Sequence, residues 1–334
     1  MIVTKGAFRS LYVPILIEQL FILLMGQADT LMLNSYSTNA VAASGMTSQI
    51  LMLITFLITI IHVGTNIRIV HLKAHQTSMI TKEIFHNLLF NIIVSIVFTL
   101  VVGMVFSPLL QLFQVPKDIF NLTYQFGLVI LSVLTLTSTQ MYIGTVLRVM
   151  NYAAIATRIT VISNLTNIIL NAFVLFIIPD LVGNPVLAVA YATAISRLLG
   201  CLLAFIALLK IYRPKLHYFK INFKILYQVS TLGIPSAGEQ ISYNFAQTFT
   251  TAFIAMLGTQ VIAAKSVATV LSGLSFSCAM AFSAACQIYL GHFIARHRYS
   301  VLKKTVLRSI WFNVIQSLII MVCVLVGFVA VGRW

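Results

Sequence analysis

The chain has 334 residues, of which 60% are hydrophobic and only 8% are charged, and its mean hydropathy is +1.01. This composition excludes a soluble globular domain, because too few polar residues remain to cover the surface of a folded core. It predicts an all-α protein, a polytopic bundle of membrane helices. The four cysteines lie within apolar runs and are expected to be small buried hydrophobes.

Apolar runs close to the ~20 residues that a bilayer requires occur about nine times along the chain. They cover residues 11–33, 46–70, 84–106, 121–145, 159–179, 186–209, 232–256, 266–290 and 308–332, each within a few positions. Turn-forming residues separate them, as at Ser107-Pro108 and Gly183-Asn184-Pro185. We therefore expect about nine transmembrane helices.

The first apolar run carries two acids, Glu18 and Asp29. Eleven positions at about 100° per residue place both on one face of a helix. An acid within lipid costs at least a few kcal/mol, so it usually faces the interior of a bundle and acts there. The alternative is a structural role, in which each acid accepts hydrogen bonds from a neighbouring helix, and this applies more to Glu18 than to Asp29.

The basic residues are distributed unevenly over the connections between spans. With a cytoplasmic N-terminus, all but four of the 21 Lys and Arg residues fall on the inner side; the exceptions are Lys117, Lys265, Arg333 and, within the sixth span, Arg197. This positive-inside bias predicts a multi-pass protein of the cell membrane with its N-terminus in the cytoplasm. The net charge of +15 therefore reports topology, and no nucleic-acid partner is expected.

The sequence repeats itself after 221 residues. The shift places Pro14 on Pro235, Glu18 on Glu239 and Gln19 on Gln240, without a gap over about seventy positions. Residues 1–215 are then a six-helix lobe, and residues 216–334 are the first three helices (seven to nine) of a second, pseudo-symmetric lobe. We expect an axis near the membrane normal, a cavity between the lobes, and a chain shortened at its C-terminus.

The fifth span carries Asn167 and Asn171 at i and i+4, at a depth where they can meet Asp29. A carboxylate in low dielectric beside amides can load and release a proton or bind Na⁺, so Asp29 and Asn167 are candidate Na⁺ ligands. Glu18 and Glu239 are further candidates for cation coupling. Arg197 is either a counter-charge or a packing residue. No Walker loop, HExxH, CxxC or GxSxG is present, so an enzyme is not expected.

Several short motifs resemble those of multidrug and toxic compound extrusion (MATE) transporters. They are Gln27-Ala28-Asp29-Thr30, Ala40 to Gly45, Gly144 to Arg148, Asn167 to Asn171, Gly183-Asn184-Pro185 and Ala192 to Arg197. The resemblance implies a family of twelve-helix proteins that export cationic or amphipathic drugs in exchange for Na⁺ or H⁺. By position, it makes Asp29 the cation-site carboxylate, Asn167 its partner and Glu239 a helix-seven acid. Many relatives have Asp at the position of Asn171.

The leading hypothesis is a monomeric secondary antiporter that exports small amphipathic cations by alternating access, with H⁺ or Na⁺ as coupling ion and no other cofactor. Its expected substrate cavity offers Phe21, Gln27, Tyr142, Gln240, Tyr243 and Asn244. One alternative is a flippase of lipid-linked saccharides from the same superfamily. Another is a fragment that does not transport.

Overall fold

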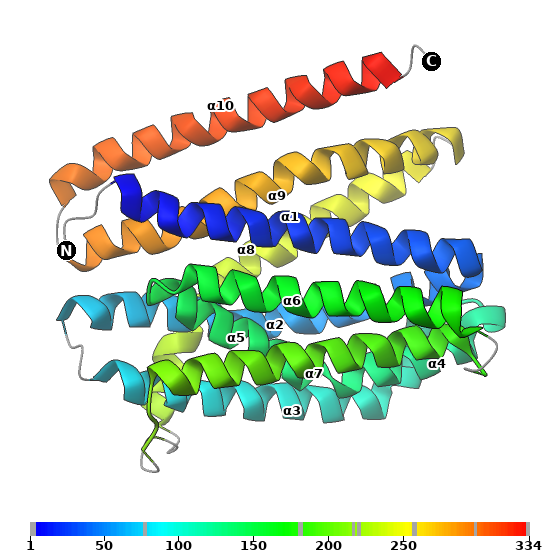
Figure 1. The fold of residues 1–334 in the computed structure, drawn as a ribbon, viewed down its shortest axis with the longest axis horizontal. Coiled ribbons are helices and arrows are strands. Elements are labelled where there is room, and N and C mark those ends of the chain that lie inside the picture. Colours follow the sequence, from blue (N-terminus) through cyan, green and yellow to red (C-terminus); the bar gives the residue numbers. More distant parts are fainter. Residues whose placement is uncertain are drawn as a thin grey trace.

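The computed structural model describes residues 5–75, 79–179, 183–215, 218, 222–255, 259–296 and 299–331. Within these residues the chain forms helices and no strand, which confirms the all-α prediction. The helices are α1 (Lys5–Tyr36), α2 (Thr38–His75), α3 (Ile80–Leu112), α4 (Lys117–Ser132), α5 (Leu134–Val149), α6 (Ala153–Ala172) with the π-helix η2 (Phe173–Ile177), α7 (Pro185–Ile211), α8 (Phe223–Ala255), α9 (Thr259–Ala295) and α10 (Tyr299–Val331). In Figure 1, α10 lies on one outer edge of the bundle beside α9, and α3 lies on the opposite edge.

Seven helices in the described residues are long and apolar enough to cross a membrane, and the pair α4–α5 makes an eighth span. The polytopic bundle is thus confirmed, and the predicted count of nine is an approximation. The helix α8 is 33 residues long but does not reach the same apolar content.

The span predicted at 121–145 is two helices that meet at an angle of 44°. Neither Pro nor Gly explains this break. Hydroxyl groups flank it instead: Ser132 Oγ donates to the carbonyl of Val129 at 2.7 Å, and Thr137 Oγ1 donates to that of Val133 at 3.1 Å. Such bonds compete with the helical backbone and bend helices. The bend gives α5 its own direction within the bundle.

The first turn of α7 follows from its sequence. Asn184 Oδ1 accepts hydrogen bonds from the backbone N–H groups of Val186 at 3.1 Å and Leu187 at 3.3 Å. Pro185 occupies the first helical position, where its missing N–H costs nothing. This cap fixes the register of a helix that carries Thr193 and Arg197 inward.

The two halves of the sequence meet in two equivalent contacts. Helix α2 packs on α8, and α1 packs on α9. A shift of 221 residues converts α1 into α8 and α2 into α9, so each contact is the counterpart of the other. This arrangement is what a two-fold relation between the halves requires.

Small residues bring these helices together. A Cβ on Gly64 would collide with the backbone carbonyl of Val229, and one on Gly233 would collide with that of Ile60, so α2 and α8 touch through their backbones. Glycine permits such close approach of membrane helices.

The equivalent contact between α1 and α9 uses alanines. Ala281 and Ala285 are fully buried in the cluster against which Phe8 and Tyr12 pack. The rings of Phe8 and Tyr12 lie 5.5 Å and 5.7 Å from that of Phe282. The contact between α1 and α9 thus combines small residues on α9 with aromatic residues on α1, whereas its counterpart between α2 and α8 uses glycines.

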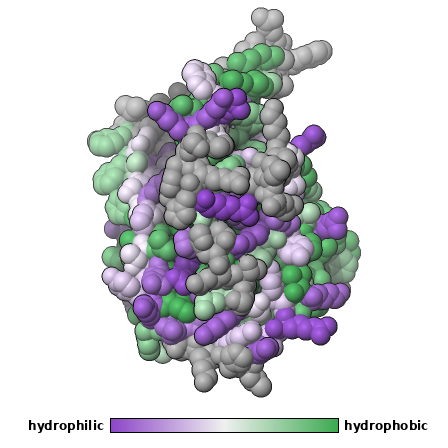
Figure 2. All heavy atoms as spheres, turned by 90° about the vertical axis from the view of Figure 1, so that its left-hand side faces the viewer, coloured by the Kyte–Doolittle hydropathy of each residue, from purple (hydrophilic) through white to green (hydrophobic). Residues whose placement is uncertain are grey.

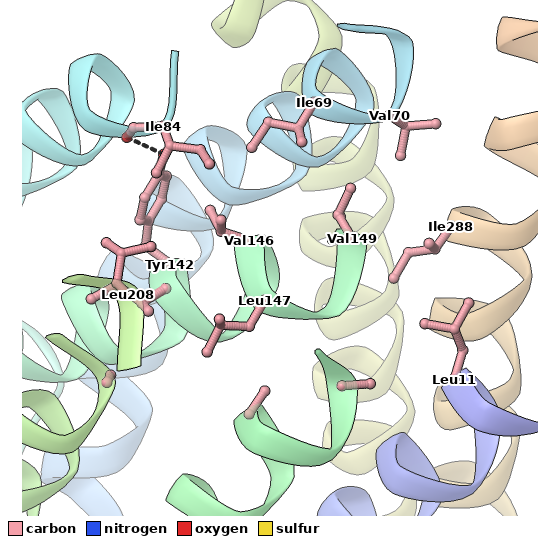
Figure 3. Close-up of a cluster of buried hydrophobic side chains, with 14 of the residues drawn as sticks. Leu11, Ile69, Val70, Ile84, Tyr142, Val146, Leu147, Val149, Leu208 and Ile288 are labelled. Carbon is pink, nitrogen blue, oxygen red and sulfur yellow. Dashed lines mark hydrogen bonds between the residues drawn. The ribbon is translucent and has the colours of Figure 1, made fainter. Parts of the chain in front are cut away.

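The largest apolar cluster lies where the two halves and helices α2, α3, α5 and α7 converge (Figure 3). Its largest fully buried side chain is Tyr142 on α5, whose hydroxyl donates to the carbonyl of Ile84 on α3 at 2.8 Å. The sequence predicts that Tyr142 faces a substrate cavity. It packs in this core instead, because its ring points to α3 and its hydroxyl finds a backbone partner there.

Basic side chains gather at one end of the bundle. Figure 2 shows this end, where hydrophilic groups lie among apolar ones. Exposed Lys and Arg residues near the helix ends that meet here include Arg9, Lys82, Arg158, Arg213, Lys215 and Lys303. The charge asymmetry that the sequence predicts between the two sides is thus present in the fold.

The close contact between α2 and α8 yields a prediction about stability. Gly64→Ala is expected to lower the free energy of unfolding by about 1–3 kcal/mol, because the new methyl group collides with the Val229 carbonyl. Gly45→Ala is the matched control on the same helix, where nothing lies within 4 Å of the new Cβ. It is expected to be neutral or stabilising by up to about 1 kcal/mol. Thermal unfolding in detergent checks both, and equal shifts of Tm would contradict the packing.

Candidate functional site

The predicted cluster around Asp29 forms between α1, α6 and α7. Asn171 Nδ2 donates to Asp29 Oδ1 at 2.9 Å, and Asn167 Oδ1 lies 3.4 Å from the same nitrogen. Asn167 Nδ2 in turn donates to Thr193 Oγ1 on α7 at 3.0 Å. Both asparagines are 1% exposed. The structure therefore brings together the acid and the two amides that the sequence places at one depth.

One acceptor in this cluster has no partner. Asn171 Oδ1 is buried and makes no hydrogen bond within the described part of the chain. No group of three or more His, Cys, Asp or Glu side chains suited to a metal occurs among the described residues. One carboxylate with amide oxygens suits a proton or a monovalent hard cation better than a transition metal. The residues Asp29, Asn167 and Asn171 thus fit the coupling ions that the sequence analysis considered.

Helix α6 changes its winding directly after this cluster. The π-helix η2 begins at Phe173, two residues after Asn171. Short π segments are often found at functional sites, because they change the direction of the side chains that precede and follow them. Here the change of winding separates the asparagine face of α6 from the loop that leads to α7.

Glu18 has a different environment, since it forms an ion pair. Its Oε1 lies 2.5 Å from Arg148 Nη2, and its Oε2 lies 3.2 Å from Arg148 Nε. Thr160 Oγ1 donates a third hydrogen bond to Oε1 at 2.9 Å. Glu18 is 3% exposed, so the pair joins α1 to α5 and α6 within the bundle. This geometry matches the structural alternative considered for Glu18; a coupling role for Glu18 stays a prediction.

A cavity of about 410 Å³ lies next to this ion pair. Its walls come from α1, α2, α5, α6, α7 and α9, so both halves of the chain contribute. The volume falls within the range of small-molecule sites, about 300–1,000 Å³. Its charged and amide-bearing lining residues are Glu18, Gln19, Asn66, Gln140, Arg148, Asn164, Arg197 and Gln287, with His62 beside them.

The residues expected to form the substrate cavity lie elsewhere. Phe21, Gln27, Tyr243 and Asn244 do not line the 410 Å³ cavity. Gln27 and Tyr243 are exposed, and the Tyr243 ring stacks on Phe276 at 5.6 Å. The rotation of a helix about its axis depends on its neighbours, which the sequence alone does not give.

Two further predicted residues lie on α8. Glu239 is exposed and does not line the cavity. The side chain of Gln240 lies outside the described residues. The coupling role proposed for Glu239 and the cavity role of Gln240 stay predictions.

The contact between Asn66 on α2 and Gln287 on α9 was not predicted from the sequence. Asn66 Nδ2 donates to Gln287 Oε1 at 3.2 Å. These positions are 221 residues apart, so they are equivalent in the repeat and their contact must lie close to the axis that relates the halves. The length of the repeat could have identified the pair.

The same two residues also line a second hollow of about 340 Å³, together with Val70, Gly291 and the inner parts of α2 and α9. Asn66 and Gln287 therefore line both spaces, and the other residues of the second hollow lie toward the C-terminal ends of α2 and α9, at the basic end of the bundle. A contact in this position can separate the two spaces.

Comparison with known proteins finds a matching protein family and a similar transporter. A family model described as MatE matches residues 14–173 and 235–329. The protein YisQ of Bacillus subtilis (strain 168), described as an uncharacterized transporter, is 30% identical over 309 residues, which are 90% of this chain and 67% of YisQ. This chain thus spans about two thirds of that relative's length.

Solved structures share the fold at low sequence identity. A MOP superfamily transporter from Pyrococcus furiosus, for which a reverse polarity of the binding pocket is reported, has a TM-score of 0.85 at 20% identity, covering 98% of this chain and 72% of its own. A point mutant of the Vibrio cholerae MATE transporter VcmN has a TM-score of 0.81 at 17% identity, with coverage of 98% and 72%. These likenesses establish the fold.

The Glu18–Arg148 pair generates a prediction with a control built into the repeat. Glu18→Gln leaves Arg148 without its counter-charge, and we expect the free energy of unfolding to fall by about 2–3 kcal/mol, below the full cost of a buried pair because the arginine is partly exposed. Glu239→Gln is the same substitution at the equivalent, exposed position and is expected to change stability by less than about 0.5 kcal/mol. Thermal unfolding of both variants in detergent measures the difference. Equal loss in the two would contradict a stabilising role for the pair.

Proposed function

The chain belongs to the MatE family, and from this premise we propose that it is a secondary active transporter that moves small amphipathic solutes across the cell membrane by cation-coupled antiport. The family is one of transporters. Multidrug export, and H⁺ or Na⁺ as the coupling ion at Asp29, are the finer parts of the proposal.

The observation that carries the proposal is the contact of Asn171 with Asp29. The acid stands inside a membrane helix, with an amide at 2.9 Å and an unpartnered amide oxygen beside it. Glu18, by contrast, is paired with Arg148. A carboxylate without an ion-pair partner among neutral oxygens favours uptake of a proton or Na⁺, because the cation removes the cost of the buried charge.

The pair Asn66–Gln287 supports alternating access. It joins the halves on their shared axis, and it separates the 410 Å³ cavity from the hollow at the basic end of the bundle. Rocking of the two halves about such an axis would separate Asn66 from Gln287 and open the cavity to that end. The positive-inside rule assigns that end, and with it the N-terminus, to the cytoplasm.

Two other functions find less support. A flippase for lipid-linked saccharides needs several free basic groups for a diphosphate, whereas Arg148 is already paired with Glu18. A fragment without transport activity would tolerate changes at Asp29, and the first experiment below distinguishes this case.

Asp29→Asn is expected to abolish the response to an ion gradient. The amide keeps the shape of the side chain but can neither take up a proton nor balance the charge of Na⁺. In everted vesicles with an imposed H⁺ or Na⁺ gradient, we expect the initial rate of dye movement to fall by about 10-fold or more, measured with ethidium as cationic dye and carboxyfluorescein as anionic dye.

The control for this experiment is Asp118→Asn, the same change at an exposed acid in the first turn of α4. It is expected to leave the rate unchanged at equal expression. Gradient-driven movement that persists in Asp29→Asn would disprove coupling at Asp29. A parent chain that moves neither dye under either gradient would count against the proposed function itself.

Bridging the gate pair, Asn66 and Gln287, is expected to block transport reversibly. With the four native cysteines replaced, Asn66→Cys and Gln287→Cys together place two thiols across the contact between α2 and α9. A short thiol-reactive bridging reagent should stop dye movement, and a reductant that releases the bridge should restore it. Each single cysteine variant, treated in the same way, should keep its activity. Unchanged transport after complete bridging would exclude separation of α2 from α9 as part of the cycle.

A further inference from the structure

We propose that the 410 Å³ cavity binds an amphipathic organic anion with a single carboxylate or sulfonate group, and that Arg197 pairs with this group. The inference rests on the proposed function, since it assumes that this cavity holds the transported solute. It replaces the expectation of a cationic substrate.

The cavity lining has a net positive charge. Three charged side chains line it: Glu18, Arg148 and Arg197. Both carboxylate oxygens of Glu18 accept hydrogen bonds from Arg148, and Oε1 accepts a further bond from Thr160. Glu18 and Arg148 therefore neutralise each other, and a cationic ligand finds no free acid among the lining residues. The remaining charge is that of Arg197.

Arg197 has no counter-ion in contact. Within the described residues, the two ion pairs are Arg68–Glu83 and Arg148–Glu18, so no carboxylate lies within 4 Å of the Arg197 guanidinium. Asp29 is close enough to interact electrostatically with Arg197, but its Oδ1 accepts its hydrogen bond from Asn171. A charged group inside a membrane bundle that lacks a contacting partner is costly unless a ligand supplies one.

A second donor faces the same space. Asn164 on α6 is 1% exposed, its Nδ2 has no hydrogen-bond partner in the described residues, and it lines the cavity. A buried amide N–H without an acceptor is unfavourable, and an anionic ligand would supply the missing acceptor. The guanidinium of an arginine binds a carboxylate or sulfonate through two parallel N–H groups. Within the described residues, Arg197 and Asn164 thus both bring unpaired donors to the lining of one cavity.

The rest of the lining suits an apolar body. Ile15, Ile22, Val63, Met141 and Ile159 contribute hydrocarbon surface to the walls. Sites for small amphipathic molecules combine such walls with a few polar groups that set orientation. One positive charge without a carboxylate in contact fits one anionic group, and it does not fit a diphosphate.

The test uses three probes that share a dansyl fluorophore and differ in charge: dansylglycine, an anion; dansylglycinamide, neutral; and monodansylcadaverine, a cation. Fluorescence titration of the purified full chain in detergent, without any gradient, gives three affinities. We expect dansylglycine to bind about 10-fold more tightly than monodansylcadaverine, the difference that one charged hydrogen-bonded contact supplies. Arg197→Gln should remove this preference.

Arg158→Gln is the matched control, because it removes one positive charge from an exposed position on α6, outside the cavity lining. It should keep the preference for the anion. Asn164→Asp is the second variant, with Arg197 retained; the new acid adds a negative charge to the cavity lining and should weaken dansylglycine binding by about 10-fold, whatever the stability of Arg197→Gln. Thermal unfolding shows that each variant is folded.

Two competitors separate the sources of the anion. Displacement of dansylglycine by decanoate indicates a soluble organic anion, and displacement by short-chain phosphatidylglycerol alone indicates a lipid headgroup; both outcomes support the anion site. Tighter binding of the cation by the parent chain, or an anion preference that survives both Arg197→Gln and Asn164→Asp, would overturn the proposal. Because no gradient is present, these results are independent of whether Asp29 couples transport to an ion.

Discussion

The ion pair between Glu18 and Arg148 neutralises two of the three charged side chains that line the protein's cavity. It joins the first helix to α5, with Thr160 on α6 as a third member, and it does so beside the cavity. Each partner alone would be a charge of several kcal/mol in cost within a membrane. Together they form a pair without net charge that connects α1 to α5. Because Arg148 neutralises the acid in the cavity lining, Arg197 is the remaining charged side chain there.

Polar groups within the bundle fall into two kinds. Atoms of the first kind have partners: Asn91 Oδ1 lies 3.0 Å from His62 Nε2 and accepts a hydrogen bond from Ser138 at 2.9 Å, across α2, α3 and α5. Such contacts between membrane helices are worth about 0.6–2 kcal/mol each and hold helices in register. Polar groups of the second kind lack a full set of partners within the described residues. They include Asn171 Oδ1 beside Asp29, Asn164 Nδ2 and Gln140 Oε1 among the cavity-lining residues, and Asn91 Nδ2 between α2, α3 and α5. Where such an atom lies beside an acid or a cavity, an ion or ligand can supply the missing partner, so Asn171 and Asn164 mark places where function is expected.

The features of this structure that depend on a single helix or on the repeat can be predicted from the sequence. The spacing of Asn167 and Asn171 and the depth of Asp29 are enough to bring the three together. The partner of Glu18 was not found, because Arg148 lies 130 positions away and belongs by sequence to the cytoplasmic ends. The chemistry of Tyr142 and Tyr243 alone suggests a cavity. Their true surroundings depend on how α5 and α8 are rotated, which only the packing of neighbouring helices decides.

The distribution of charged and neutral contacts fits a molecule whose halves move. In the part of the chain that the structure describes, both ion pairs lie within the first 215 residues, α1 to α5 and α2 to α3. Hydrogen bonds between the halves end on neutral groups instead: Arg68 donates to Gln228, Asn66 to Gln287 and Tyr12 to Gln316, and the backbone N–H of Asn222 donates to His86 Nε2. A neutral amide that loses its partner is rehydrated at small cost, whereas a broken buried ion pair leaves two charges exposed to lipid. In the proposed transport cycle, the ion pairs would hold the first lobe together, and the contacts that end on neutral groups at its boundary would be the ones that break.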